Sequence, residues 1–494
     1  MIQVTSVENM RKSDEFTIKS STPAKELMYR AGKGIFESHS WQGKTLIACG
    51  TGNNAGDGYV LASLLSDGGY DVSLLLLEER FSVDGEYYFN ICKEKKVPWS
   101  VYNSEKIEDY NTVVDCVFGT GFKGEPRGKA KELIEAINES GAFVLSADIN
   151  SGLNGDSGLG VKCVKSDLTV SIGTYKCGHF LGMAKDLIKE KQNIDIGINL
   201  IESPYSLIEK KDVKELLGKR QSYSNKGTYG YIALIGGCTE YSGAVKLANL
   251  AASAMRAGAG VTKLCVPKSL VASVSPYLLE STLCPLSDRE GSVEFRENEI
   301  QGALNGVKAI GVGMGLGQRG DNQALLSYIL NNYSLPIVID ADGLNTLAKM
   351  DMSILKSTKC KAILTPHPKE LERLSDVPLE KILESPVECA VNFARKTGAV
   401  VLLKGAATVI TDGERVILSD TGCAGMATAG SGDVLSGIIT ALCASHSDTL
   451  MCAAAGAYIN GLAGELASWE FGDISMVASD TARSIAKAVN LITK

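Results

Sequence analysis

Short apolar runs alternate with segments of helical length along most of the chain. In the first part these runs are rich in Val, Ile and Leu without strict alternation, as strands buried on both faces of a sheet are. The segments between them, such as 58–69 and 130–141, have helical length and end on glycine, which often closes a helix. This order predicts a parallel α/β sheet. The expected strands are 44–50, 70–78, 112–121, 142–152 and 167–173.

The pattern relaxes over residues 201–222, which contain a proline and a lysine-rich stretch but no strand. A second α/β series follows and closes with a helical stretch at 430–445. We therefore predict a boundary near residue 210, with one domain over 1–210 and a second over 211–494. The strands expected in the second domain are 229–237, 260–267, 307–317, 336–343, 361–368, 400–410 and 415–420.

Composition narrows the class of protein without changing this picture. The 494 residues carry a net charge of −7, which disfavours nucleic acid and anionic membranes as partners. The start lacks the apolar core of a signal peptide, and no uninterrupted apolar stretch reaches the roughly 18 residues that span a bilayer. The 13 cysteines form no C-x-x-C pair and lie in apolar runs, as expected of small buried side chains in a reducing compartment. We expect a soluble cytoplasmic protein.

The loop after the first predicted strand, GTGNNAGDG, allows two interpretations. Its first glycines permit a tight turn, and the amides of the following helix can bind phosphate, as in a dinucleotide site. However, Asn53, Asn54 and Asp57 place oxygen atoms in this turn, and oxygen-rich turns can ligate a hard cation. The alternative is that these side chains only cap the helix.

Two later strand ends favour a site over capping. Asp115 lies within a strand that runs into a glycine-rich loop, and Asp148 ends the next strand, with Ser151 just beyond it. The carboxyl ends of parallel strands share one edge of a sheet, where ligands bind. Asn54, Asp115, Asp148 and Ser151 are therefore expected to converge.

The motifs NN-x-GDG, D-x-x-x-GTG and D-x-x-SG, in this order, resemble the NAD(P)H-hydrate epimerase family over about residues 1–205. The resemblance implies a Rossmann-like three-layer sandwich, with potassium held by Asn54, Asp115 and Ser151. The sequence departs from the family at Ala55, where the family usually has Gly, and at Asn150, where it usually has Pro. We expect Asn150 to loosen the turn before Ser151. The implied contacts to the hydrated nucleotide are Asn53, Asn54, Ala55, Gly56, Asp57, Gly119, Thr120, Gly121, Phe122, Lys123, Gly124, Glu125 and Asp148, with Asp148 the candidate for proton transfer.

In the second domain, the stretch DTGCAGMATAGSGDVLSG (420–437) runs from a glycine-rich loop straight into a helix. Free amides at such a helix start can bind an anion, and the helix dipole adds positive potential there. Asp433 lies beside this cradle and can act as a base near a transferring phosphate. The alternative is an ordinary helix start with a favourable first-turn charge.

The G-S-G-D sequence resembles the ribokinase-like fold, in which the matching aspartate is the catalytic base. Further motifs resemble the ADP- or ATP-dependent NAD(P)H-hydrate dehydratase family: KGTYG, YSGA, GMGLG, DADGLN, TPHPKE and LKGAATVI. Departures stand at Cys423, often Asn, and at Thr428-Ala429, often Lys-Gly. The resemblance implies Asp433 as catalytic residue, Gly432 as phosphate contact, Lys404, Gly405, Ala406, Ala407 and Thr408 as nucleotide contacts, and Ala244, Gly315, His367 and Asp433 as contacts to the hydrated nucleotide.

Residue by residue, simpler structural roles stay open in this domain. His367 between two prolines can be a surface turn residue, Asp340 and Asp342 can cap the next helix, and Asn345 can lie on the surface. Lys404 is harder to explain without an anion, because burying its charge is costly.

Together the resemblances predict an α/β protein of two domains that repairs hydrated NADH and NADPH. The first would interconvert the R and S epimers with potassium, and the second would dehydrate the S epimer with ADP or ATP and Mg²⁺. The family also implies a homo-oligomer. Three alternatives are a ribokinase-like hydroxyl kinase, which would leave the first domain unexplained, a redox dehydrogenase using the first loop, and a non-catalytic nucleotide sensor, which would not need Asp433.

Overall fold

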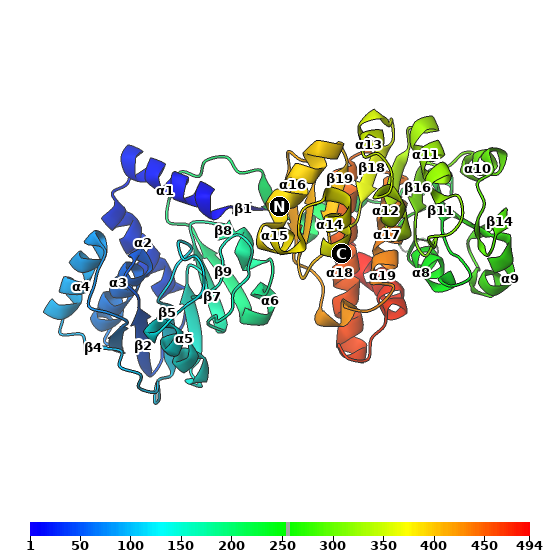
Figure 1. The fold of residues 1–494 in the computed structure, drawn as a ribbon. Coiled ribbons are helices and arrows are strands. Elements are labelled where there is room, and N and C mark those ends of the chain that lie inside the picture. The colour runs from blue at the N-terminus through cyan, green and yellow to red at the C-terminus, as the bar shows by residue number, and fades with distance from the viewer. Residues whose placement is uncertain (253–256) are drawn as a thin grey trace. The chain divides into compact units, whose positions relative to one another are not determined.

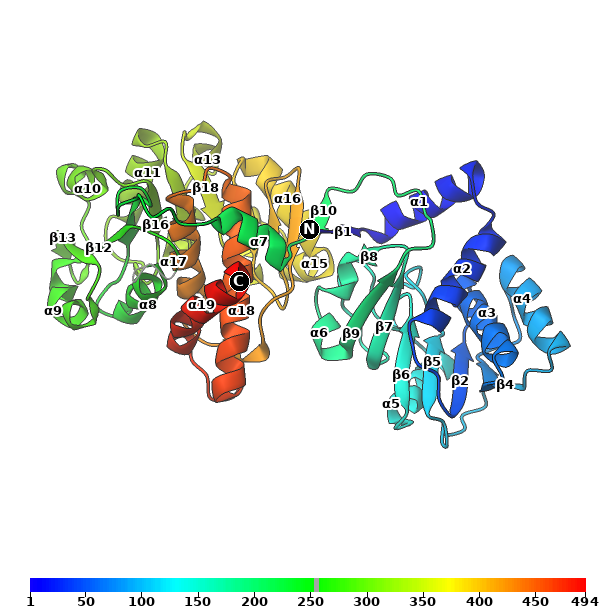
Figure 2. The same cartoon turned by 180° about the vertical axis from the view of Figure 1, so that it is seen from behind.

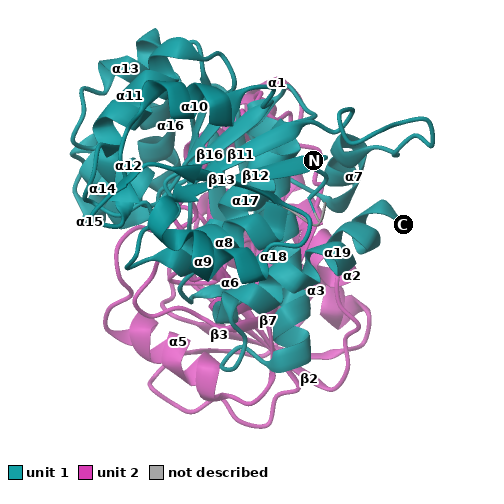
Figure 3. Ribbon diagram, turned by 90° about the vertical axis from the view of Figure 1, so that its right-hand side faces the viewer, with its two compact units in different colours: residues 1–2, 205–494 teal, residues 3–204 magenta. Residues whose placement is uncertain are grey.

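The computed structural model describes residues 1–252 and 257–494. It divides the chain into two compact units, coloured separately in Figure 3. The N-terminal unit is Gln3–Pro204, and the C-terminal unit is Tyr205–Lys494 together with Met1–Ile2. The division falls inside the segment where the strand pattern relaxes, and each unit contains a largely parallel sheet with helices, so the predicted α/β class is confirmed.

The N-terminal unit contains a seven-stranded sheet in which every neighbouring pair is parallel. All five predicted strands are present. The sheet also has a strand at each edge that was not predicted, because the exposed β4 and the charged β9 lack an apolar run. The strand order is β4 (Trp99–Val101), β3 (Asp71–Leu76), β2 (Lys44–Cys49), β5 (Thr112–Cys116), β6 (Phe143–Ala147), β7 (Ser166–Ile172) and β9 (Ile188–Ile194).

Apolar cores cover both faces of this sheet. In β2, Leu46 and Ala48 belong to one core and Ile47 and Cys49 to the other, which explains the continuous apolar run. Helices α2 (Ala24–Glu37), α3 (Asn53–Asp67) and α4 (Val83–Glu94) contribute to one core and α5 (Lys129–Glu139) to the other (Figure 1). The remaining elements are β1 (Ile2–Thr5), α1 (Val7–Ser20), β8 (Tyr175–Lys176) and α6 (Ala184–Leu187).

The strand order reverses between β2 and β5. The chain leaves β2 towards β3 and β4 on one side, and then returns to β5 on the other. Loops that follow the strands at such a reversal diverge and leave a crevice where ligands bind. In this unit they are the loop before α3 and the loop after β5.

The C-terminal unit contains a larger mixed sheet. Its strands are parallel from β13 to β19, whereas β20 and β21 are antiparallel, and β10 is parallel to β21. The predicted strand 400–410 is two strands joined by a hairpin. The order is β13 (Thr282–Leu286), β12 (Val261–Pro267), β11 (Tyr231–Ile235), β16 (Ala309–Val312), β17 (Pro336–Ile339), β18 (Lys361–Leu364), β19 (Val400–Leu403), β20 (Thr408–Thr411), β21 (Val416–Ser419) and β10 (Tyr205–Leu207).

The principal core of this unit lies on one face of the sheet. It is formed largely by α8 (Ser242–Ala252), α17 (Ser431–Cys443), α18 (Thr449–Phe471) and α19 (Ala478–Thr493). Figure 2 shows α7 (Lys210–Leu217) lying across α18 and α19. On the opposite side of the sheet lie α11 (Asn322–Asn332), α13 (Ser353–Ser357) and α16 (Pro386–Thr397) (Figures 1 and 2).

By length and hydropathy alone, one described helix, α18, is long enough to cross a membrane. Since 72% of its most apolar window is buried inside the protein, it is a core helix. All 13 cysteines are free thiols, and all but Cys284 and Cys423 are buried, as the sequence predicts.

Candidate active sites

The N-terminal unit has a cavity of about 520 Å³ at the strand-order reversal. The residues predicted to contact a nucleotide that line it are Asn53, Asn54, Asp57, Gly119, Thr120, Gly121, Phe122 and Asp148. The remaining predicted contacts do not line the cavity. Ala55 and Gly56 are buried within α3, and Lys123, Gly124 and Glu125 are exposed on the loop after β5.

Helix α3 begins at Asn53, earlier than predicted. Its N-cap is Gly52, and no side chain caps it, so the capping alternative for the two asparagines is wrong. Instead, both amide atoms of the Asn54 side chain are buried without a hydrogen-bond partner. A Cβ added at Gly119 would lie 3.3 Å from the Asn54 side chain and 3.4 Å from Asp148 Oδ2, so these residues face one another. A buried unpaired amide is costly and marks a ligand position.

Asp115 and Ser151 meet as predicted, because Asp115 lies in β5 and Ser151 follows β6, the neighbouring strand. Ser151 Oγ is 2.5 Å from Asp115 Oδ1 and accepts from the Phe118 amide at 2.7 Å. Asp115 is fully buried and accepts four donors in all, including the Ser151 and Val117 amides and the Ser146 hydroxyl. Burial raises its pKa, and these hydrogen bonds oppose the rise.

This group of residues fits a potassium ion. The Asn54 carbonyl oxygen has no partner, and Ser151 keeps one lone pair, so both can ligate a hard cation. All four acceptor positions of Asp115 are already occupied by donors. Asp115 therefore contributes negative charge and orients Ser151, and direct ligation would require it to release a donor.

Asn150 does not loosen the turn before Ser151. Its fully buried side chain donates to the Val164 carbonyl at 2.9 Å, the Ser166 hydroxyl at 3.0 Å and the Leu187 carbonyl at 3.2 Å. It also accepts from Thr169 Oγ1 at 2.6 Å. The amide thus ties the turn to its neighbours, contrary to expectation. Ala55 lies within a helix, so its methyl group meets no conformational penalty.

Asp148 lies directly after β6, with a positive φ of 63° that few non-glycine residues adopt. Its Oδ1 is 2.5 Å from the Lys176 ammonium, and its Oδ2 accepts from the Thr120 amide at 3.3 Å. Burial works against its charge, but Lys176 and the hydrogen bonds outweigh burial and lower its pKa. Asp148 is therefore held ionised at neutral pH.

Sequence reasoning missed four charged residues that line this cavity, Arg11, Asp14, Asp84 and Lys176. Burial raises the pKa of Asp14 to about 6, opposed by Lys176 and reinforced by Asp148. Burial, then Asp148 and Asp14, also raise the pKa of Asp57. Lys176 follows the carboxyl end of β7 by four residues, so the same strand-end argument had the means to find it. No sequence pattern singles out Asp14 on its helix.

In the C-terminal unit the strand order reverses between β11 and β16, and two predicted contacts meet there. A Cβ at Gly315, which has φ +63°, would lie 2.9 Å from Ala244 Cβ at the start of α8. Next to it, a Cβ at Gly313 would overlap the carbonyl oxygen of Asp340. The loops after β11, β16 and β17 therefore converge at one edge of the sheet.

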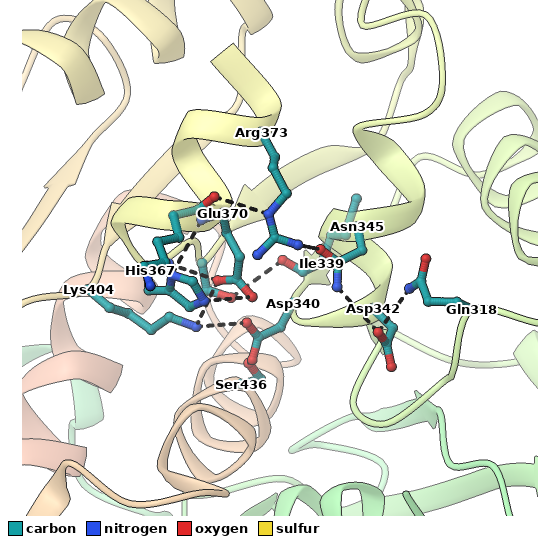
Figure 4. A network of polar contacts seen from close by, with 12 residues as sticks. Gln318, Ile339, Asp340, Asp342, Asn345, His367, Glu370, Arg373, Lys404 and Ser436 are labelled. Carbon is teal, nitrogen blue, oxygen red and sulfur yellow. Dashed lines mark hydrogen bonds and ion pairs between the residues drawn. The ribbon is translucent and has the colours of Figure 1, made fainter. Parts of the chain in front are cut away.

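Asp340 is the centre of the polar network drawn in Figure 4. Its carboxylate lies 3.0 Å from Lys404 Nζ and accepts from the Ser436 hydroxyl at 2.6 Å, so it does not cap a helix. Burial disfavours its charge, but Lys404 and Ser436 outweigh burial and lower its pKa. Burial alone would lower the pKa of Lys404, but Asp340 and Glu370 raise it. The anion expected beside Lys404 is thus supplied by the protein.

His367 is the N-cap of α14 (Pro368–Ser375) and forms a capping box with Glu370. The His367 amide donates to Glu370 Oε2 at 2.8 Å. The same Glu370 carboxylate lies 3.6 Å from Lys404 Nζ, so it is the second anionic partner of this lysine after Asp340. Asn345, which receives a hydrogen bond from Arg373, belongs to the same network (Figure 4). The imidazole is 43% exposed, so it can cap the helix and still meet a ligand.

Asp433 lies in the first turn of α17, whose N-cap is Gly430 and which no side chain caps. A Cβ at Gly432 would lie 3.4 Å from Lys404 Nζ and 3.5 Å from Asp340 Oδ2, so the helix start faces the network. Burial first, then the charge of Asp340, raise the pKa of Asp433 to about 7, while Lys404 opposes the rise. A carboxylate that titrates near neutral pH can exchange a proton during catalysis.

Residues 404–407 form the turn between β19 and β20, and Thr408 begins β20; Gly405 and Ala406 are exposed, and Lys404 directly follows β19. Among the described residues, no three His, Cys, Asp or Glu side chains gather as metal ligands. The carboxylates nearby are the oxygen donors that Mg²⁺ prefers, with phosphates supplying the rest. The site therefore fits an ion that enters with a nucleotide.

Known proteins match both units. The family model described as NAD(P)H-hydrate dehydratase matches residues 232–487, and the YjeF-related protein N-terminus matches 24–178. A bifunctional NAD(P)H-hydrate repair enzyme of Moorella thermoacetica is 33% identical, covering 93% of this chain and 91% of its own. The counterpart of the same name in Archaeoglobus fulgidus is 34% identical, with 94% and 93% covered.

Solved structures match the C-terminal unit. An ADP/ATP-dependent NAD(P)H-hydrate dehydratase of Bacillus subtilis, co-crystallised with ATP and Mg²⁺, is 28% identical with a TM-score of 0.50, covering 58% of this chain and 98% of its own. A ribokinase-like protein of Enterococcus faecalis, 23% identical with a TM-score of 0.51 over 60% of this chain and 98% of its own, shares the fold. With near full-length relatives above 30% identity and a family model that matches more than half of the residues, the chain belongs to the family of bifunctional NAD(P)H-hydrate repair enzymes.

Proposed function

We propose that this chain restores NADH and NADPH that have been hydrated at C6 of the nicotinamide ring. The domain over 1–210 interconverts the R and S epimers, and the domain over 211–494 dehydrates the S epimer at the expense of ADP or ATP. The observation that carries this proposal is the near full-length match to bifunctional repair enzymes. It is supported by two sites, one with Asp148 directly after a strand and one with Asp433 at a helix start.

In the dehydration step, the C6 hydroxyl oxygen forms a bond to the terminal phosphorus of ATP or ADP. Asp433 takes the hydroxyl proton, and the bridging P–O bond of the nucleotide breaks. The C–O bond then breaks, its electron pair leaves with inorganic phosphate, and the ring nitrogen supplies electrons to C6. Loss of the proton at C5 restores the 1,4-dihydronicotinamide ring of NADH or NADPH. Phosphorylation is needed because hydroxide itself is a poor leaving group.

The helix start supplies the remaining stabilisation in this step. The first amides of α17 have no partner within the helix and can receive the phosphoryl oxygens at Gly432. The segment Lys404–Thr408 would line the nucleotide, and Ala244, Gly315 and His367 the hydrated ring. Mg²⁺, when bound with the nucleotide, supplies charge neutralisation for the transferring phosphoryl group.

In the epimerisation step, Asp148 is our candidate for proton transfer at the C6 hydroxyl. The cavity residues listed above would bind the nucleotide, with the stacked rings of Phe118 and Phe122, 4.2 Å apart, on the loop that forms one wall. Potassium, held by Asn54 and Ser151 beside Asp115, would supply positive charge to the bound substrate. A homo-oligomer and a cytoplasmic location remain predictions.

The test uses purified protein and a mixture of R- and S-hydrated NADH, with absorbance at 340 nm followed with and without ADP or ATP. Full recovery that depends on Mg²⁺ and a nucleotide supports both activities. Recovery that stops at the S fraction would contradict the epimerase assignment, provided that spontaneous epimerisation is slow. No recovery with either nucleotide, together with a stable phosphorylated product of another alcohol, would favour a ribokinase-like hydroxyl kinase.

A further inference from the structure

A buried lysine, Lys176, faces the cavity of the N-terminal unit. Its side chain is 1% exposed, and its ammonium group donates to Asp148 Oδ1 at 2.5 Å and to the Ile172 carbonyl at 2.9 Å. Burying an ammonium group is costly unless it is paired, and this one is paired with a residue that itself lines the cavity. Two of its three donors are used, which leaves one for a bound ligand.

His179 holds the backbone of Asp148 from the other side. Its Nδ1 accepts from the Lys176 amide at 3.0 Å, so its proton is on Nε2, which lies 2.7 Å from the Asp148 carbonyl oxygen. Burial and the neighbouring Lys176 lower the pKa of His179 to about 4, so the ring stays neutral. Lys176 and His179 thus fix the charge and the left-handed backbone of Asp148 together.

We infer that Lys176 is a positioning residue of the epimerase site, which keeps the Asp148 carboxylate ionised and directed into the cavity. This inference rests on the proposed function. The titratable groups that interact with Asp148 are Lys176, Asp14, Asp57 and the neutral His179, and Arg11 and Asp84 also line the cavity. Without the lysine, three carboxylates would share one partly buried space with no cation directly bonded to Asp148. Burial would then raise the pKa of Asp148 without a bonded cation to oppose it, so Asp148 would hold a proton to higher pH.

The test measures R-to-S interconversion without nucleotide, by chromatographic separation of the epimers, from pH 5 to 9 and relative to the spontaneous rate. The variants are Lys176→Met and the charge-conserving Lys176→Arg. Lys95→Met is the matched control, because Lys95 also forms an ion pair, with Asp67 at 2.5 Å, but does not line the cavity. Dehydration of pure S epimer with ATP reports on the C-terminal unit in every variant.

We expect Lys176→Met to slow epimerisation by about 10²-fold at pH 7 and to move the acidic limb of kcat/KM up by roughly 1–3 pH units. Lys176→Arg should return the limb to its wild-type position. A slower Lys176→Met variant whose acidic limb does not move would overturn the inference, as would a variant with wild-type rates. If Lys176→Met does not fold, the pH profile of the wild-type epimerisation rate tests the inference instead. A wild-type acidic limb at or above pH 6 would also overturn the inference. An inactive wild type would instead refute the epimerase function itself.

Discussion

Replacing Asp433 by asparagine should stabilise the C-terminal unit and abolish most of its activity. Burial and the nearby Asp340 raise the pKa of Asp433 from 3.8 to about 7. Between about pH 4 and pH 7 the folded protein therefore keeps a proton that the unfolded chain has released. Over this window the free energy of unfolding of the wild type falls by up to about 1.4 kcal/mol per pH unit, and above pH 7 the loss is complete.

The size of the effect follows from the difference of about three pH units. If solvent did not screen the charge at all, the free energy of unfolding would fall by about 4 kcal/mol by pH 8. Because the side chain is only half-buried, we expect a fall of about 2 kcal/mol. Asparagine carries no charge and escapes this loss. The Asp433→Asn variant should thus gain about 2 kcal/mol over wild type at pH 8 and almost nothing at pH 4, while kcat for dehydration falls by about 10²–10⁴-fold.

The assay is denaturant unfolding at several pH values, following the transition that ATP shifts. The control is Asp376→Asn, which makes the same charge change at an exposed position with φ +59°, a conformation that asparagine tolerates. The difference in unfolding free energy between this control and the wild type should not increase with pH. An equal gain for Asp433→Asn at pH 4 and pH 8, or no gain at pH 8, would refute the assigned environment of Asp433.

Four further outcomes are expected. Gly432→Ala places a methyl group in ordinary contact with Lys404, so it should fold normally but raise KM for ATP by about 10-fold, and an unchanged KM would contradict the phosphate cradle. Gly119→Ala crowds Asn54 at 3.3 Å and should slow epimerisation, while dehydration of pure S epimer stays unchanged. Asn54→Ala should lose the rise in melting temperature that KCl gives over NaCl; a persisting rise would place potassium elsewhere. Dehydration kcat/KM should increase with pH up to about 7 and then level off, whereas a flat profile would exclude Asp433 as the base.

The sequence predicts the interior of each sheet better than its edges. Strand β2 has a continuous apolar run because it is buried on both faces of the sheet. Edge strands such as β4 and β9 are short or charged, because water contacts one side of them, so the same criterion passes over them. The hairpin between β19 and β20 was missed because its turn lies inside a single apolar run.

The candidate sites show the same division. Asp115 and Asp148 are predicted to converge, because both follow from strand ends that share an edge. The partners that set their protonation come from elsewhere in the chain: Ser146 from the neighbouring strand, Lys176 from beyond β7 and Asp14 from α1. Pattern and spacing identify the end of a strand, but they do not record which ammonium group folds onto which carboxylate.

That pairing separates the chemistry of the two sites. In the N-terminal unit Lys176 donates directly to Asp148, so the lysine outweighs burial and the carboxylate stays ionised. In the C-terminal unit the equivalent cation, Lys404, is bonded to Asp340, and Asp433 therefore meets the negative charge of Asp340 as well as a more distant ammonium group. Burial then prevails, and Asp433 titrates near neutral pH. Because Asp340 is paired with Lys404, Asp433 has no bonded cation among the described residues and can accept a proton from a hydroxyl group. The glycine-rich motif alone would not give Asp433 this property.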